Sequence, residues 1–144
     1  MREADLPAVR GIEALSFSNP WSDATFLGEI QNKGISFPMI IVRPEDGRVI
    51  GYIIYWQIRD EVQINNVAVH PDFRGKGIGE AAMRLVLKEV REQSAVFVTL
   101  EVRVSNTPAV RLYEKLGFKA LGRRKGYYTN PVEDAYVMGL ALGP

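Results

Sequence analysis

The sequence of 144 residues has no cysteine, a single histidine and no long apolar run, and each absence excludes a class of function. Without cysteine the chain has no disulfide framework, no thiol nucleophile and no thiolate zinc site, which favours the reducing cytoplasm as its compartment. His70 is the one imidazole that a metal site or a Ser-His-Asp hydrolase could use, and we expect no metal centre. Because no apolar run reaches about 18 residues, we expect neither a signal core nor a transmembrane helix.

An excess of charge of either sign is also missing. The 18 Lys and Arg residues against 17 Asp and Glu residues leave a net charge of +1. This balance argues against a nucleic acid or a membrane surface as the main partner. At about 150 residues per domain, the length predicts one domain over residues 1–144 that is large enough to bury a hydrophobic core.

Hydrophobic periodicity predicts a mixed α/β (α+β) domain. Asp5 before Leu6-Pro7 is typical of a helix N-cap, and Ser22 is expected to cap a second helix. A helix ending at Glu92 is expected to bury Ile78, Ala82, Leu85 and Val86. The expected elements, in order, are helices from 6 and 23, strands 37–43, 49–59 and 61–69, a helix to 92, strand 96–104, a helix from 107 to 116, and strands 118–125 and 134–142.

The third expected strand contains a break in its alternation. Val62 and Ile64 alternate, but the next large apolar residue, Val67, follows three positions later, after Asn65-Asn66. One extra residue predicts a β-bulge, which leaves backbone N–H and C=O groups free for an extended ligand. The alternative is that Asn66 simply faces solvent.

A glycine-rich segment, Arg74-Gly75-Lys76-Gly77-Ile78-Gly79, lies between this strand and the next helix. Glycines at a helix start let the backbone approach a ligand closely, and the free N–H groups with the helix dipole favour a phosphate. The spacing fits neither a P-loop, which needs Ser or Thr after Gly-Lys, nor the dinucleotide fingerprint, which needs Gly where Glu80 stands. The alternative is a flexible turn without a ligand.

These residues resemble the GCN5-related N-acetyltransferase (GNAT) superfamily. Residues 74–79 match its Q/R-x-x-G-x-G/A pyrophosphate loop, and the Asn-Val-Ala-Val-His-Pro run before them is similar to its pantetheine-binding strand. The segments 100–106 and 112–118 resemble the RimI-type branch, which acetylates N-terminal alanine in ribosomal proteins, as do Pro20-Trp21-Ser22 and residues 123–128. Two departures are visible. Only residues 1–4 precede the first helix where the family has a full strand, so we expect a short or weak edge strand, and Asn19 stands where many relatives are more apolar.

The resemblance implies a mixed, mostly antiparallel sheet with flanking helices and a bulged fourth strand, and acetyl-CoA as cosubstrate. It implies that the carrier is bound by residues of the bulged strand, of the glycine loop and of the segment before the next helix: Val67, Ala68, Val69, Arg74, Gly75, Lys76, Gly77, Ile78, Gly79 and Asn106. An oxyanion donor is expected from a backbone N–H around Val67 to Val69. Asn106 has helix capping as its simpler role.

Two residues are candidates for the chemistry. Glu101 lies on one face of an otherwise apolar strand, where partial burial is expected to raise its pKa toward that of a useful base. Its alternative role is a surface carboxylate paired with an arginine. Tyr113 has the spacing of a core aromatic, but by resemblance it is the general acid for the coenzyme A thiolate. With no cysteine to carry an acyl group, we expect direct transfer in a ternary complex.

The ordinary pKa values of amines favour an N-terminal acceptor. At pH 7.5 an α-amine is roughly a quarter neutral and a lysine only about 0.1%, a difference of about 3 kcal/mol. Trp21, Tyr127 and Tyr128 are expected to form the walls of a peptide slot, although scattered aromatics are more often core residues. The expected acceptor is therefore a protein N-terminus, by resemblance that of ribosomal protein S18. The alternatives are a small-molecule amine, an internal lysine, or a non-catalytic domain that binds coenzyme A.

Overall fold

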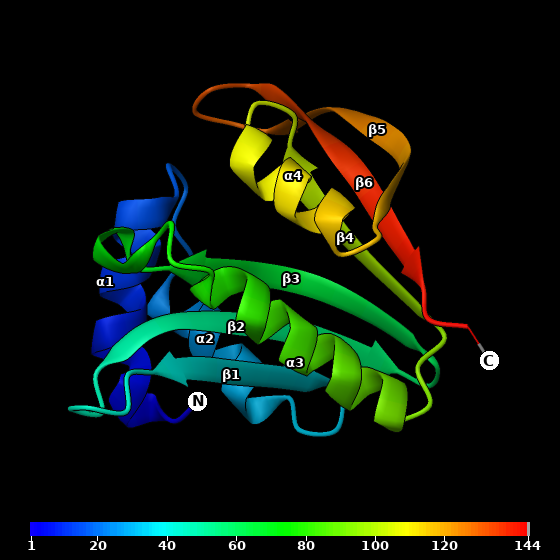
Figure 1. Cartoon of the computed structure of the whole chain (residues 1–144). Coiled ribbons are helices and arrows are strands. Elements are labelled where there is room, and N and C mark those ends of the chain that lie inside the picture. Colours follow the sequence, from blue (N-terminus) through cyan, green and yellow to red (C-terminus); the bar gives the residue numbers. More distant parts are fainter. Residues whose placement is uncertain (144) are drawn as a thin grey trace.

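The computed structural model describes residues 1–143, so Pro144, the last residue of the expected domain, lies outside the described residues. The chain forms one six-stranded sheet with helices on both faces (Figure 1). The elements are the 3-10 turns η1 (Glu3–Asp5) and η2 (Pro71–Phe73), the helices α1 (Leu6–Ser16), α2 (Asp23–Gln31), α3 (Ile78–Glu92) and α4 (Thr107–Lys115), and the strands β1 (Ser36–Val42), β2 (Val49–Ile58), β3 (Glu61–Val69), β4 (Phe97–Arg103), β5 (Lys119–Tyr128) and β6 (Glu133–Ala141).

The strand order is β1-β2-β3-β4-β6-β5, and every neighbouring pair is antiparallel except β3 with β4. The parallel pair requires a crossover, and α3 supplies it. The expected mixed, mostly antiparallel sheet with flanking helices is confirmed.

The capping and turn residues in the sequence predicted most ends of the helices and strands correctly. The Ser22 hydroxyl accepts a hydrogen bond from the Thr25 amide (3.2 Å), as expected of an N-cap. Asp5 is the N-cap residue of α1 and Pro7 lies in the first turn, as expected, but the Asp5 side chain does not cap the helix. Its carboxylate accepts from the Arg2 amide instead (2.8 Å), because the 3-10 turn before α1 gives Asp5 a helical backbone.

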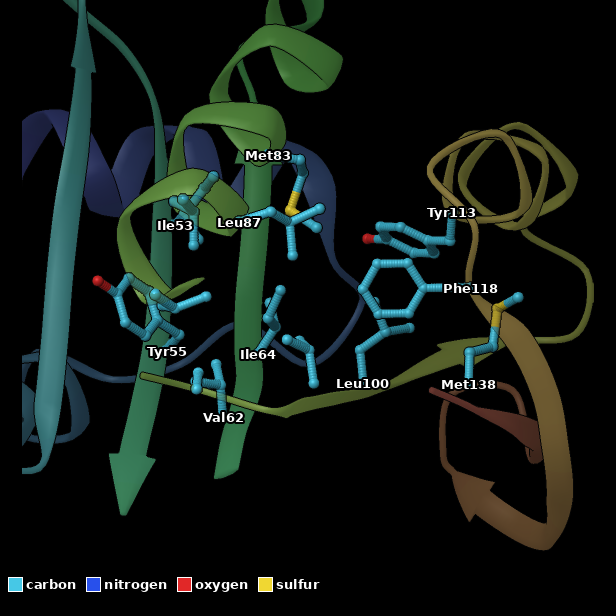
Figure 2. Close-up of a cluster of buried hydrophobic side chains, with 14 of the residues drawn as sticks. Ile53, Tyr55, Val62, Ile64, Met83, Leu87, Leu100, Tyr113, Phe118 and Met138 are labelled. Atoms are coloured by element: carbon cyan, nitrogen blue, oxygen red, sulfur yellow. The ribbon is translucent and has the colours of Figure 1, made fainter. Parts of the chain in front are cut away.

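Strand β2 is buried on both faces and separates two hydrophobic clusters. Tyr52 and Ile54 pack against α1 and α2, and Ile53 and Tyr55 pack against the side of α3 and α4 (Figure 2). The expected core face of α3 was partly wrong, because Leu85 is 69% exposed. The buried face is rotated by about one residue, or 100°, and consists of Met83, Val86, Leu87 and Val90.

The expected bulge is confirmed. Ile54 pairs with Asn66 and the next residue, Tyr55, pairs with Ile64, so Asn65 is the extra residue in β3. Asn66 is only 7% exposed, which excludes the solvent-facing alternative. The bulged strand is the third, not the fourth, because residues 1–143 contain no strand before α1.

Gly51 in β2 packs directly against the backbone of the bulged strand β3. A Cβ at Gly51 would lie 2.7 Å from the carbonyl oxygen of Ala68, which is backbone and cannot rotate away. We expect Gly51→Ala to lower the free energy of unfolding by about 1–3 kcal/mol in urea titrations. Gly28→Ala is the matched control, because nothing lies within 4 Å of its Cβ. In the interior of α2 that change should raise stability by about 0.5–1 kcal/mol. Equal effects of the two changes would contradict this account.

Candidate active site

The sheet is split between β3 and β4. The two strands pair only where Glu61–Ile64 meets Phe97–Leu100, and beyond that point they diverge (Figure 1). The cavity in the gap has a volume of about 500 Å³. It is lined by residues from both strands, from α1 and α4, and from the segments after α1 and after β5.

The bulge gives this cavity one of its walls. Asn65, Asn66 and Val67 line it, and the Asn65 Nδ2 is buried without a hydrogen-bond partner within residues 1–143. Val67 is the one member of the expected Val67–Val69 group that lines the cavity. The Ala68 side chain is buried in the cluster under α1 and α2 and does not line the cavity.

Glu101 and Tyr113 both line the cavity. The Glu101 side chain is 16% exposed, and its Oε1 lies 3.1 Å from the Nε of Arg124. Glu101 is therefore paired with an arginine, as the alternative role required, and it also lines the cavity. Burial raises the pKa of Tyr113 to about 12, so this phenol stays protonated at neutral pH. Its ring packs against Phe118, and its hydroxyl points from α4 toward α3 (Figure 2).

The glycine loop lies outside this cavity, at the start of α3. Gly75 and Gly77 have φ values of 76° and 77°, in the left-handed region that favours glycine. In the described part of the chain, the backbone N–H groups from Gly75 to Glu80 donate no hydrogen bond to another protein group. Six free N–H groups beside a helix N-terminus form a site suited to a phosphate.

The side chains of the loop have separate environments. The Arg74 guanidinium is held by protein, because its Nε donates to the Val69 carbonyl and its Nη2 to the Ser16 hydroxyl (both 2.9 Å). Lys76 and Ile78 line a second cavity of about 520 Å³, which the sequence did not indicate. Gly79 faces Val69, whose Cγ2 would lie 3.7 Å from an added Cβ.

Of Asn106 and the three expected aromatic residues, all but Tyr127 line the cavity. Asn106 lines the cavity and caps α4, since its Oδ1 accepts from the Ala109 amide (3.3 Å). Trp21 and Tyr128 line the cavity as well. Tyr127 does not, is 48% exposed and packs edge-on against Tyr128. Hydrogen bonding to Glu101 raises the pKa of Tyr127, and burial raises that of Tyr128 to about 12.

A buried carboxylate in the cavity wall was missed by the sequence reasoning. Glu13 is 1% exposed, and its carboxylate accepts hydrogen bonds from the Tyr52 hydroxyl, from Asn66 Nδ2 (2.9 Å) and from the Trp21 amide (2.8 Å). Burial and the bond to Glu13 raise the pKa of Tyr52. A signal was present, because Glu13 follows Ile12 on the apolar face of α1 and a carboxylate there needs partners.

This chain is similar in sequence and in structure to known acetyltransferases. Residues 6–118 match the family model described as Acetyltransferase (GNAT) family. A Bacillus subtilis (strain 168) relative, named provisionally as a [ribosomal protein bS18]-alanine N-acetyltransferase, is 39% identical over 142 residues, 99% of this chain and 93% of its own. The [ribosomal protein bS18]-alanine N-acetyltransferase of Escherichia coli (strain K12) is 33% identical over 144 residues, 99% of this chain and 95% of its own. The crystal structure of the Escherichia coli ribosomal-protein-S18-alanine N-acetyltransferase matches 100% of this chain and 92% of its own, with a TM-score of 0.91 and 32% identity.

The split mixed sheet, with a cavity in its gap and a glycine loop before α3, is the fold of an acyl-group transferase. The chain belongs to the acetyltransferase (GNAT) family, which uses acetyl-CoA. It is an N-acetyltransferase, as its relatives over nearly its full length are. In residues 1–143 no helix is long and apolar enough to cross a membrane, and no group of three His, Asp or Glu side chains could hold a metal.

The Glu13 cluster should be essential to the stability of the site. Glu13→Ala leaves two buried side-chain donors and one backbone donor without an acceptor, so we expect it to lower the free energy of unfolding by about 3–5 kcal/mol. Tyr52→Phe removes one donor and leaves the carboxylate with two, so it should cost less. The exposed Glu114 on α4 is the control, and Glu114→Ala should stay within about 0.5 kcal/mol of the parent. Similar midpoints for Glu13→Ala and Glu114→Ala in denaturant would contradict the assignment.

Proposed function

We propose that this protein is an acetyl-CoA-dependent N-terminal α-amine acetyltransferase. We propose the N-terminal alanine of ribosomal protein S18 as its acceptor and the cytoplasm as its compartment. The observation that carries the proposal is the cavity in the sheet gap, which brings Glu101 and Tyr113 together from β4 and α4. The relatives' names support a protein N-terminus over a small amine or an internal lysine.

The glycine loop fits the pyrophosphate of acetyl-CoA. Two adjacent phosphates of this cosubstrate each carry a negative charge, and the free N–H groups from Gly75 to Glu80 can hydrogen-bond them without a cationic side chain. We assign the pantetheine arm to the edge of β3 that faces the gap, at Val67 to Val69, because that edge has left its partner β4. Asn106 is assigned to the same carrier from the other side of the gap.

Two protein side chains account for the protons in the proposed transfer, since Glu101 accepts one and Tyr113 donates one. The neutral α-amine attacks the thioester carbonyl, the C–N bond forms, and Glu101 takes the proton that the amine loses. A backbone N–H of β3 near Val67 stabilises the oxyanion. The C–S bond then breaks, and Tyr113 donates its proton to the departing thiolate. Burial suits Tyr113 to this role, because it keeps the phenol protonated until it is needed.

The aromatic residues take different roles in this proposal. Trp21 and Tyr128 form walls for the acceptor, since both line the cavity. Tyr127 lies outside it, and its interaction with Glu101 raises the pKa of its phenol, so we assign it to supporting that carboxylate rather than to touching the peptide.

The acceptor is tested by intact-mass spectrometry. The panel contains free Ala-, Ser- and Met-first peptides, N-blocked peptides with lysine, and a polyamine, each with acetyl-CoA and the protein. We expect the mass of one acetyl group on free N-termini only, with Ala-first peptides fastest, because the α-amine is far more often neutral than lysine at pH 7.5. Acetylation of blocked peptides or of the polyamine would overturn the assignment. Coenzyme A binding without any transfer would identify a non-catalytic domain.

The pH dependence tests the roles of the two proton-transfer groups. With an Ala-first peptide, kcat/KM should rise about tenfold per pH unit below about pH 7.7, as the α-amine loses its proton. It should then stay level to about pH 10, because the raised pKa of Tyr113, about 12, keeps the acid protonated. Tyr113→Phe should lower kcat by about 10²–10⁴-fold. A decline in rate beginning near pH 9, or an unchanged rate in a Glu101→Gln, Tyr113→Phe double variant, would contradict these roles.

A further inference from the structure

One arginine joins the two chain segments that flank the acceptor side of the cavity. Arg103 ends β4, two residues after Glu101 on the same face of the sheet, and its side chain is 21% exposed. Its Nη1 donates to the Pro131 carbonyl (3.1 Å) and to Glu133 Oε1 (3.2 Å). Its Nη2 donates to the Thr129 carbonyl (2.8 Å) and to the hydroxyl of Ser18 (3.3 Å).

The same guanidinium also fixes an aromatic wall. Its Cζ lies 4.5 Å from the centre of the Tyr128 ring, a cation–π distance. Its ion-pair partner Glu133 is held in turn by the Ser105 amide (2.7 Å). Arg103, Ser105, Tyr128 and Glu133 all line the cavity, so this network belongs to the wall itself.

A second set of contacts joins the same two segments directly. Asn19 Nδ2 donates to the carbonyl (2.8 Å) and to the hydroxyl (2.7 Å) of Thr129, and Asn130 Nδ2 donates to Asn19 Oδ1 (2.8 Å). More than 100 residues separate these partners in the chain. Segment 17–21 follows α1, and segment 127–133 runs from the end of β5 through the turn to the first residue of β6. These two segments are therefore tied twice, once by Arg103 and once by Asn19.

We propose that Arg103 is a positioning residue for the acceptor, which fastens segment 127–133 to segment 17–21 so that the two form a single wall. The occupant of that wall is the acceptor peptide, so this inference rests on the proposed function. If the two segments moved separately, the peptide would have to order them on binding, which would weaken its affinity. Because Arg103 and Asn19 already order both segments in the folded protein, the peptide does not have to. The effect should therefore fall on the KM of the peptide and leave the transfer step unchanged.

Lysine cannot replace arginine in this arrangement. The guanidinium presents donors in a planar fork that reaches Ser18 and Glu133 at once, whereas an ammonium is a point donor on a flexible stem. It also stacks less favourably over an aromatic ring. Arg103→Lys keeps the charge and the ion pair but gives up the bridge, so it separates electrostatic support from positioning.

The test compares Arg103→Ala, Arg103→Lys and Asn19→Ala with Arg123→Ala. Arg123 is the matched control, because it also pairs with a β6 carboxylate, Asp134, and lies 5.7 Å from a tyrosine ring, but outside the cavity lining. We expect Arg103→Ala to raise the KM of an Ala-first peptide at least about tenfold, with smaller rises for Arg103→Lys and Asn19→Ala. In these variants the KM of acetyl-CoA and kcat at saturating peptide should stay within about twofold of the parent. Arg123→Ala should leave the KM of the peptide, the KM of acetyl-CoA and kcat all unchanged.

Hydrogen exchange of the unliganded protein tests the same bridge without any acceptor. Arg103→Ala and Asn19→Ala should each speed exchange in both segments, 17–21 and 127–133, while the core strands stay protected. Faster exchange in only one segment, or a fall in kcat with unchanged peptide KM, would overturn the inference. If the parent acetylates no N-terminal amine, the proposed function fails and the exchange result still decides the coupling. If the parent is active and the variants keep its peptide KM, this inference alone fails.

Discussion

The hydrogen-bond ladder between β3 and β4 ends after four residue pairs, and the site depends on that interruption. A continuous sheet satisfies its own N–H and C=O groups, so it offers nothing to an extended ligand. Here the extra residue Asn65 bends β3 away from its neighbour, and the two strands leave a cavity of about 500 Å³ between them. The free edge of β3, the carboxylate on β4 and the phenol on α4 all face that space.

Two hydrophobic clusters, one on each face, cover the split sheet. On one face α3 packs over β2 and β3 while α4 packs over β4 and β6, so each half of the sheet has its own cover (Figures 1 and 2). On the other face α1 and α2 cover β2. The buried Glu13 then joins α1 to the bulge through Asn66, which fixes the cavity wall by polar contacts that apolar packing alone does not specify.

How far each feature could be predicted follows the range of the interaction that makes it. The bulge was visible as a break in a two-residue alternation, and the Ser22 cap depends on a residue three positions away. Leu85 was misplaced because the apolar residues of α3 fit more than one face of the helix, and only packing against the sheet selects one. Glu13 and Arg103 were missed because their partners come from other elements, such as Asn66, 53 residues from Glu13.

The sequence by itself determined the local conformations and the available chemistry: strands and helices from periodicity, left-handed turns at glycine, and no thiol for a covalent intermediate. It also carried the family resemblance, through motifs that are contiguous in the chain. Only the tertiary structure decided which polar side chains share the cavity, that Tyr127 lies outside it, and that segments 17–21 and 127–133 form one wall. The physical reason is that hydrophobic burial, which drives folding, is non-directional. A pattern shows which face of an element is buried, but the partner on that face is fixed by packing of the whole chain.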